Sequence, residues 1–400
     1  MIASKPITPN NVGIFLGVER LTGGMFQYAL AVLEALSKLS PHQYSVVIAY
    51  SDQAWAPILE RLGLSGYRMK HSRIGQRIGD IGMALRLPIS INQILGKIFN
   101  PLIWELHALR CDAWFFPAGE TLTYQMSGRM IGVIHDLMHR YEPSFPEVSK
   151  LFRYGLREHR MGNIARYCKA VLVDSNIGRQ HVIDSYGVSE KKVYVVPYIA
   201  PSYLHSTSER IDFDGRYKLP SKYIFYPAQF WPHKNHLRLI EALKMASQDG
   251  CDDVQLVLSG AKRYRYEEVK ACVDRLGLTE KVHFVGYIPD NDLRGFYLRA
   301  RAMIMPTFFG PTNIPPLEAI ATGCPVIVSG IYGMPEQLGD AALYFDPKSI
   351  SEIAERIKKV WSDDDLVKKM SRKGLEQSLA YGQAEFNSKI EHVIESLFIG

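Results

Sequence analysis

Short apolar runs alternate with longer amphipathic stretches along most of this chain. Such runs fit strands buried on both faces of a parallel sheet, and the stretches between them, such as 24–39 and 177–186, fit the covering helices. The runs lie at 12–16, 44–49, 113–116, 130–134, 170–173 and 193–196 in the first half, and at 223–226, 255–259, 282–284, 302–305, 325–328 and 342–344 in the second. The pattern predicts an α/β protein with two doubly wound, Rossmann-like sheets.

The alternation breaks between residues 197 and 220, where PYIAPSYLHSTSERIDFDGRYKLP is polar and punctuated by proline. We expect a linker at 201–220, between an N-terminal lobe at 1–200 and a C-terminal lobe at 221–382. The tail at 383–400 is typical of a helix with one apolar face, and we expect it to join the first lobe. A chain of 400 residues is also long for a single hydrophobic core. Two such lobes facing each other would bind ligands in the cleft at the carboxyl ends of their strands.

The overall composition is that of an ordinary globular protein, with 47% hydrophobic and 22% charged residues. The first residues lack the features of a secretory signal, and no apolar stretch reaches the roughly 18 residues that span a bilayer. These observations predict a cytoplasmic protein. Five scattered cysteines, Cys111, Cys168, Cys251, Cys272 and Cys324, are not spaced as metal ligands or redox pairs, so we expect them to be reduced and mostly buried.

Positive charge is concentrated in the segment 61–110. It contains Arg61, Arg68, Lys70, Arg73, Arg77, Arg86, Lys97 and Arg110, against only Asp80 and Glu105. Apolar residues such as Ile74, Ile78 and Leu85 are interleaved with these charges, as on a surface that meets anionic lipid headgroups. A solvated helical face is an equally acceptable interpretation. Nucleic acid is not an expected partner, because no array of stacking aromatic residues accompanies the charges.

Two loops that follow predicted strands carry features of phosphate binding. In the first lobe, GVERLTGGMFQYAL places Gly23 and Gly24 before a helix, where free amides and the helix dipole favour phosphate. A plain tight turn is the alternative, and the absence of GxGxxG weakens a dehydrogenase interpretation. In the second lobe, Lys234 of AQFWPHKNHLRLIEAL lies just before a predicted helix, where it would meet a diphosphate unless it is a simple surface lysine.

The segment GPTNIPPLEAIATGCP lies between two predicted strands of the second lobe. Its prolines predict a helix that begins at about Pro316 and ends at Gly323. Glu318 would then lie in the first turn, where the helix dipole favours a carboxylate and where it could accept hydrogen bonds from both hydroxyls of a ribose. A capping carboxylate is the alternative interpretation.

Taken together, these motifs resemble the retaining glycosyltransferases of family 4, which have the GT-B fold of two Rossmann-like lobes. The donor-site signature of that family is matched by Pro315, Leu317, Glu318, Ala319, Ala321, Gly323, Pro325 and Val326. HKNHLRLIEAL resembles the family's lysine loop, TGGMFQYA its phosphate loop, and GVIHDLMH the strand end that carries its histidine. The resemblance covers nearly the whole chain and is weakest between residues 50 and 110.

Two departures from the family pattern concern the donor sugar. The first glutamate of the family's pair is replaced by Gly310, and the GFG that follows it becomes PTN at residues 311–313. The basic residue that usually precedes the lysine is Gln229. We therefore expect the hexose to be held by the amides of Asn313 and Ile314 and by the Asn313 side chain.

The resemblance implies a metal-independent hexosyltransferase without a cofactor, acting in polysaccharide or lipopolysaccharide synthesis. A hexose or deoxyhexose, with mannose from GDP-mannose as the best candidate, would pass with retention of configuration to a glycan or lipid-linked acceptor bound by the first lobe. His135 would orient the sugar or acceptor with help from Asp136, unless it is a core or turn histidine. Tyr287 and Ile288 would meet the base. Lys234 and helix dipoles would take the place of a cation, since no Asp-x-Asp ends a strand.

Two alternatives remain at this level. The chain could be a non-catalytic nucleotide-sugar-binding subunit of a transferase complex, an interpretation that Gly310 favours. It could also be a nucleotide-sugar epimerase of the same fold, although no acid and base pair stands out in the sequence. A cytoplasmic enzyme attached peripherally to the inner face of a membrane agrees with the basic segment 61–110.

Overall fold

The computed structural model describes residues 9–20, 23–69, 81–82, 84–150, 152–205 and 213–399. The chain divides into two compact units. Unit 1 comprises residues 1–143, 148–197 and 383–400, and unit 2 comprises 144–147 and 198–382. The sequence placed the boundary at residue 200, and the internal contacts of the units place it after Pro197. The C-terminal tail therefore belongs to the first unit.

Unit 1 is built on a parallel sheet of seven strands in the order β3-β2-β1-β4-β5-β6-β7. The strands are β1 (Asn10–Leu16), β2 (Tyr44–Tyr50), β3 (Tyr67–Arg68), β4 (Ala113–Phe116), β5 (Arg129–Val133), β6 (Ala170–Val173) and β7 (Val193–Val195). Every residue of β4 and β6 is buried, as their continuous apolar runs require when helices cover both faces. Such a sheet directs the carboxyl ends of all its strands to one edge.

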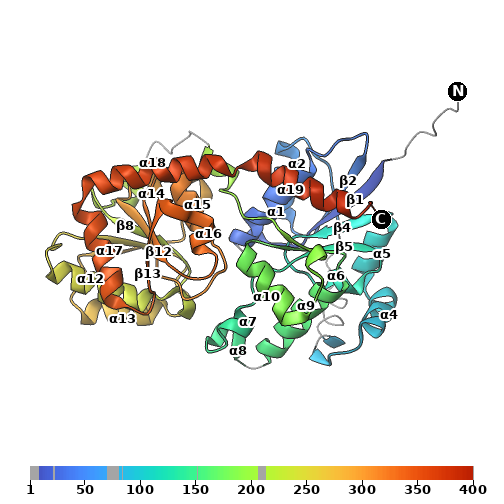
Figure 1. The fold of residues 1–400 in the computed structure, drawn as a ribbon, viewed down its shortest axis with the longest axis horizontal. Helices are drawn as coiled ribbons and strands as arrows, with labels where there is room; N and C mark the ends of the chain where they lie inside the picture. The colour runs from blue at the N-terminus through green and yellow to red at the C-terminus, as the bar shows by residue number, and fades with distance from the viewer. Residues whose placement is uncertain are drawn as a thin grey trace. The chain divides into compact units, whose positions relative to one another are not determined.

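Helices cover this sheet on both sides (Figure 1). They are α1 (Gly24–Leu36), α2 (Ala56–Arg61), α4 (Ile89–Phe99), α5 (Pro101–Ala108), α6 (Leu122–Gln125), α7 (Met138–Tyr141), α9 (Arg153–Tyr167), α10 (Asn176–Tyr186) and α19 (Gln383–Ser396), with α8 (Pro146–Ser149) at the crossing between the units. The C-terminal helix α19 packs against α1 and buries Phe386, Ile390, Val393 and Ile394. The apolar face predicted for the tail is therefore the contact that joins it to unit 1.

Unit 2 has a parallel sheet of six strands in the order β10-β9-β8-β11-β12-β13. The strands are β8 (Ile224–Pro227), β9 (Leu256–Ser259), β10 (Val282–Gly286), β11 (Ala302–Met305), β12 (Val326–Ser329) and β13 (Ala342–Phe345). The helices are α11 (Phe213–Tyr217), α12 (His236–Gln248), α13 (Tyr266–Arg275), α14 (Asp290–Arg299), α15 (Ile314–Ala321), α16 (Met334–Leu338), α17 (Ile350–Ser362) and α18 (Asp364–Ala380). The strand order changes direction between β8 and β11. Open sheets of this type bind ligands at such a topological switch point.

The predicted fold class is confirmed, and each of the twelve predicted runs overlaps an observed strand. The sequence missed β3, because its two residues, Tyr67 and Arg68, are exposed and carry no apolar pattern. The segment predicted as linker contains a 3₁₀ turn, η4 (Ser202–His205), and the short helix α11, so part of it is ordered structure of unit 2.

Candidate functional site

Two loops at the carboxyl edge of the second sheet bring Lys234 and Asn313 together. Lys234 ends the 3₁₀ turn η5 (Pro232–Lys234) after β8, and Asn313 precedes α15 after β11. Because β8 and β11 are parallel neighbours, their following loops meet at the same edge. The ammonium of Lys234 donates a hydrogen bond to Asn313 Oδ1 at 3.2 Å. The predicted phosphate-binding lysine thus lies beside the residue predicted to hold the hexose.

Asn235 fixes the backbone of the lysine loop. It adopts a left-handed conformation, with φ of 60°, in which asparagine is more stable than most residues. Its side-chain amide donates to the carbonyls of Pro306 and Pro347, each at 2.8 Å. The Tyr226 hydroxyl also donates to the Lys234 carbonyl at 2.8 Å. These contacts tie the loop to the ends of β11 and β13 and hold the lysine in place.

Glu318 is buried, and both of its carboxylate oxygens accept hydrogen bonds from tyrosines. The Tyr203 hydroxyl donates to Oε1 at 2.5 Å, and the Tyr297 hydroxyl donates to Oε2 at 2.7 Å. Burial raises the pKa of Glu318, and the two tyrosines only partly oppose that effect. The expected position in the first helical turn is wrong, because α15 begins at Ile314 and Glu318 is its fifth residue. The ribose role assigned to Glu318 remains a prediction.

Gly310 and Asn313 depend on each other sterically. Gly310 has φ of 140°, and a Cβ added there would lie 2.5 Å from Asn313 Nδ2. The Asn313 amide donates to Gln337 Oε1 at 3.2 Å, and Gln337 Nε2 donates to the Asn313 carbonyl at 2.8 Å. The backbone amide of Asn313, which we expected to hold the hexose, therefore already donates to Gln337 in this structure. The Asn313 side chain faces Lys234.

The other residues assigned to the donor lie on neighbouring loops of unit 2. Gln229, after β8, accepts a hydrogen bond from the Ala261 amide at 3.3 Å and so links the loops after β8 and β9. Tyr287 and Ile288 follow β10, with the Tyr287 side chain 56% exposed and Ile288 buried. Their positions at this edge agree with the base-contact hypothesis, which stays a prediction.

In unit 1, the glycine loop follows β1 and leads into α1. Gly23 precedes α1 with φ of 66°, and no atom lies within 4 Å of a Cβ built there. A side chain is therefore excluded by backbone conformation rather than by space. Gly24 is the first residue of α1 and, like Gly23, is exposed. The loop opens a helix N-terminus, as predicted.

His135 and Asp136 follow β5, but their surroundings differ. His135 Nε2 lies 2.9 Å from the Pro117 carbonyl, and burial lowers the pKa of this histidine. Asp136 Oδ1 accepts hydrogen bonds from Arg157 at 2.6 Å and from the Met138 amide at 2.8 Å. Burial alone would raise the pKa of Asp136, but these two partners outweigh burial and lower it. Asp136 thus has a structural role here as partner of Arg157.

The sequence analysis missed Glu120, which lies in the loop after β4. Its Oε2 accepts a hydrogen bond from the Ala118 amide at 3.1 Å. Burial raises the pKa of Glu120 to about 7, against weaker opposing contributions from backbone amides and Arg160. The available signal was a lone acidic residue directly after Gly119, at the end of a predicted strand.

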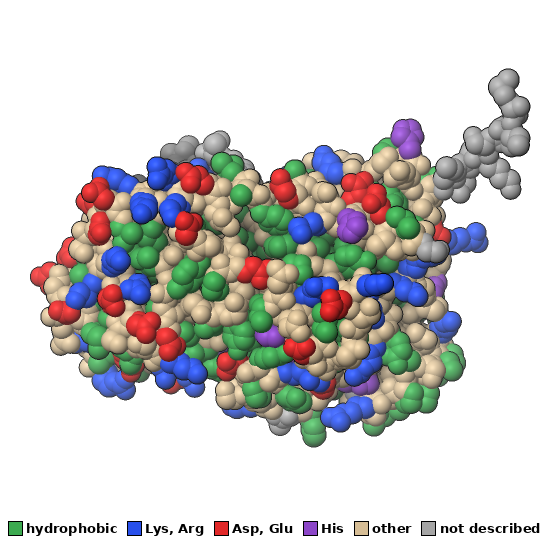
Figure 2. Space-filling model, in the orientation of Figure 1, with side chains coloured by type: hydrophobic (Ala, Val, Ile, Leu, Met, Phe, Trp, Pro, Cys, Tyr) green, Lys and Arg blue, Asp and Glu red, His purple; other side chains and the backbone are tan. Residues whose placement is uncertain are grey.

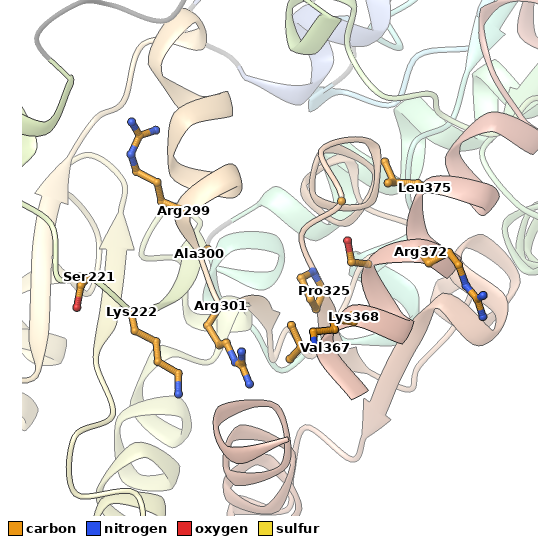
Figure 3. Close-up of a pocket in the computed structure, with 12 residues that line it drawn as sticks. Ser221, Lys222, Arg299, Ala300, Arg301, Pro325, Val367, Lys368, Arg372 and Leu375 are labelled. Carbon is orange, nitrogen blue, oxygen red and sulfur yellow. The ribbon is translucent and has the colours of Figure 1, made fainter. Parts of the chain in front are cut away.

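A pocket of about 600 Å³ lies at the opposite, amino edge of the second sheet (Figure 3). Its lining includes Lys222, Arg299, Arg301, Lys368 and Arg372. Figure 3 shows Lys222 and Arg301 extending in the same direction while Arg299 points away from them. Lys222 Nζ donates to the Trp361 carbonyl and Arg301 Nε to the Val360 carbonyl, both at 2.7 Å. These two cations cap the carboxyl end of α17, so their charge is used by the fold.

The basic segment 61–110 is described in part. Lys70, Arg73, Ile74, Ile78, Arg77 and Asp80 lie outside the described residues. In the described part, α4 exposes Ile91, Ile94 and Ile98, by 42%, 55% and 53%, at spacings of three and four residues along one helical face. Figure 2 shows hydrophobic and basic side chains side by side over α4.

Metal ligands and membrane spans were sought over the described residues. Across those parts of the chain, no three His, Cys, Asp or Glu side chains are grouped as a metal ion would require. No described helix combines the length and apolarity needed to cross a bilayer. The five cysteines are free thiols, and all except the half-buried Cys111 are buried.

Comparison with known proteins agrees with this architecture. Residues 207–377 match the family model described as Glycosyl transferases group 1. The second unit carries a glycosyl transferases group 1 domain. The O-antigen chain mannosyltransferase B of Escherichia coli is 27% identical over 52% of this chain and 56% of its own length. The O-antigen chain mannosyltransferase RfbU of Salmonella typhimurium is 28% identical over 60% of this chain and 62% of its own length.

The fold is shared with solved glycosyltransferase structures. Anabaena Alr3699/HepE, solved in complex with UDP and glucose, superposes on 97% of this chain and 100% of its own with a TM-score of 0.73 at 15% identity. A glycosyltransferase from Rickettsia africae covers 98% of this chain and 99% of its own, with a TM-score of 0.69 at 16% identity. At such low identity the likeness shows the fold alone, which is the two-lobe α/β architecture of GT-B glycosyltransferases. The curated mannosyltransferases are matched over little more than half of their length.

Proposed function

We propose that this protein is a retaining glycosyltransferase that moves a hexose or deoxyhexose from a nucleotide diphosphate sugar to a glycan or lipid-linked acceptor. Mannose from GDP-mannose is the first candidate, because the two relatives described above are named as O-antigen mannosyltransferases. The observation that carries the proposal is the group formed by Lys234, Asn313 and Glu318 at the carboxyl edge of the second sheet. This edge is where open α/β sheets bind nucleotides.

Each member of this group has a separate task in the proposed reaction. Lys234 neutralises the diphosphate as the glycosyl bond breaks, and Glu318 receives the ribose hydroxyls. Asn313 takes the place of the glutamate that is missing at position 310, because its side chain lies beside the lysine. The acceptor hydroxyl attacks from the face that the diphosphate leaves, and a phosphate oxygen takes its proton. Retention of configuration follows from this geometry.

We further propose that the reaction needs neither a divalent metal ion nor a cofactor. The charge of Lys234 and the helix N-terminus next to Asn313 supply positive potential to the diphosphate. Chelation of metal ions with EDTA should therefore leave transfer unchanged. A loss of activity that Mg²⁺ or Mn²⁺ restores would contradict this part of the proposal.

Peripheral attachment to an anionic membrane is part of the same proposal. The apolar face of α4 carries three exposed isoleucines, and Arg86, Lys97 and Arg110 of the same segment are exposed. An apolar helical face accompanied by such cations lies in the headgroup layer, with its apolar side chains buried and the cations near lipid phosphates. A lipid-linked acceptor would be reached from this position.

The alternative that Gly310 favours is a subunit that binds nucleotide sugars without turnover. A panel of nucleotide sugars incubated with oligosaccharide and lipid-linked acceptors separates the two functions. Transfer, or slow acceptor-independent hydrolysis of one donor, supports the enzyme. Tight binding of a donor without turnover by any member of the panel would favour the binding subunit.

A further inference from the structure

Glu120 presents a carboxylate oxygen that the described chain leaves without a partner. Oε2 is held by the Ala118 amide. Oε1 is inaccessible to solvent, and no described residue offers it a hydrogen bond. A buried polar atom in this state is rare and costly in folded proteins. A ligand hydroxyl is the kind of donor that would complete it.

Oε1 lies at the carboxyl edge of the first sheet, where two glycines allow the backbone to approach closely. Gly17 directly follows β1, and a Cβ built there would lie 3.4 Å from Oε1. Gly119, with φ of 66°, places the loop so closely against β5 that its own Cβ would lie 3.0 Å from the Val133 carbonyl. His135 contacts the same loop through the Pro117 carbonyl. The loop that carries Glu120 is therefore in contact with the histidine that was predicted to orient a sugar.

The charges around Glu120 favour a neutral hydroxyl over a phosphate. The positive charge of Arg160, in α9, attracts the Glu120 carboxylate. The same guanidinium attracts Asp136 and is repelled by the like charge of Arg157. One shared guanidinium leaves the carboxylate incompletely neutralised, so an anionic diphosphate next to Oε1 would be repelled. Sugar hydroxyls carry no such penalty and donate readily to carboxylates.

We propose that Glu120 binds the acceptor, with Oε1 accepting a hydrogen bond from a hydroxyl of the acceptor sugar. This inference rests on the proposed glycosyltransferase function and adds the residue that recognises its acceptor. The hydrogen bond is stronger when the carboxylate is ionised, so acceptor binding weakens as the pH falls through the titration of Glu120. Glu120 forms no covalent bond and takes no proton in the reaction, because the phosphate oxygen remains the proton acceptor.

The test compares the full-length protein with E120Q, which keeps the shape of the side chain and removes its charge. E60Q, an exposed acid of α2 for which the structure gives no contact with the site, is the matched control. With the donor that the panel identifies, E120Q should raise KM for the acceptor at least tenfold, since a hydrogen bond to a charged group is lost. Acceptor-independent donor hydrolysis should stay within about twofold of wild type. The pH dependence of acceptor KM should flatten in E120Q.

Equal losses of hydrolysis and transfer in E120Q would overturn the assignment, because Glu120 would then serve the donor or the fold. An unchanged acceptor KM would overturn it as well. Binding of both proteins to an array of immobilised oligosaccharides tests Glu120 without catalysis. Glycans that bind wild type and E60Q but not E120Q would support the assignment. Identical binding patterns for the three proteins would contradict it. Absence of turnover with every donor would count against the proposed function instead.

Discussion

The Tyr203 hydroxyl lies 2.5 Å from Glu318 Oε1 and occupies the oxygen that the proposed function assigns to a ribose hydroxyl. Tyr203 belongs to η4, a few residues after the boundary between the two units at Pro197. A ribose that takes both oxygens of Glu318 competes with this phenol for Oε1 and with the Tyr297 hydroxyl for Oε2. Nucleotide binding would thus release a contact made by the segment that joins the units.

Replacing Tyr203 by Phe should tighten the binding of GDP or UDP about tenfold or more. The variant removes a competing hydrogen bond to a charged group, which contributes about 1.5 kcal/mol or more. Isothermal titration calorimetry measures the change, with Y67F as a control at an exposed tyrosine of unit 1. Weaker binding in Y203F would mean that the phenol helps to hold the nucleotide.

Restoring the family glutamate with G310E should lower the free energy of unfolding by about 1–3 kcal/mol. Position 310 has a positive φ, a backbone conformation that is strained for any residue with a side chain. Its Cβ would also collide with the Asn313 side chain, 2.5 Å away. The double variant G310E/N313G removes the collision and should recover part of the lost melting temperature. If the loss of stability in the double variant equals the sum of the losses in G310E and N313G, the two positions are not sterically coupled.

Glu120 should make stability depend on pH in a predictable direction. Its pKa is about 7 in the folded protein against an ordinary value of 4.5. Because the folded-state pKa is the higher one, this carboxyl favours folding fully below pH 4.5 and loses that contribution as the pH rises through 7. The melting temperature of E120Q relative to wild type should therefore increase between pH 5 and pH 8. Thermal unfolding at several pH values checks this, and a constant difference would exclude such a pKa.

The exposed face of α4 should control binding to anionic vesicles. I94S/I98S removes two side chains that are 55% and 53% exposed, and binding should fall at least tenfold if they enter the lipid. L379S, at an 84% exposed leucine of unit 2, is the control. Sedimentation with phosphatidylglycerol vesicles measures binding, which should also weaken as salt is raised. Equal binding by the two variants would remove α4 from the interface.

The sequence predicted the strands of both sheets well because their apolar runs are continuous and local. The carboxyl-edge position of Lys234 followed from the same pattern, since the residue lies in the loop that follows β8. The local sequence pattern did not predict contacts between residues far apart in the chain. Tyr203 and Glu318 are 115 positions apart, and no local pattern connects them.

The start of α15 shows a second limit of sequence analysis. Three consecutive helix-compatible positions, Ile314, Pro315 and Pro316, could each open the helix. The structure begins it at Ile314, which moves Glu318 out of the first turn and into a buried position between two tyrosines. Helix ends are the least determined feature of a sequence pattern, and here the error changed the environment of a proposed site residue.

The release of nucleoside diphosphate from a sugar donor tests the central claim most directly. Wild type, K234A and E318A are each incubated with GDP-mannose and the other donors of the panel, alongside K270A, which removes an exposed lysine of α13. The account predicts turnover of one donor by wild type and K270A, and a loss of about a hundredfold or more in K234A and E318A. Full activity in K234A and E318A would contradict the donor site described here, and no turnover of any donor by wild type would contradict the enzyme itself.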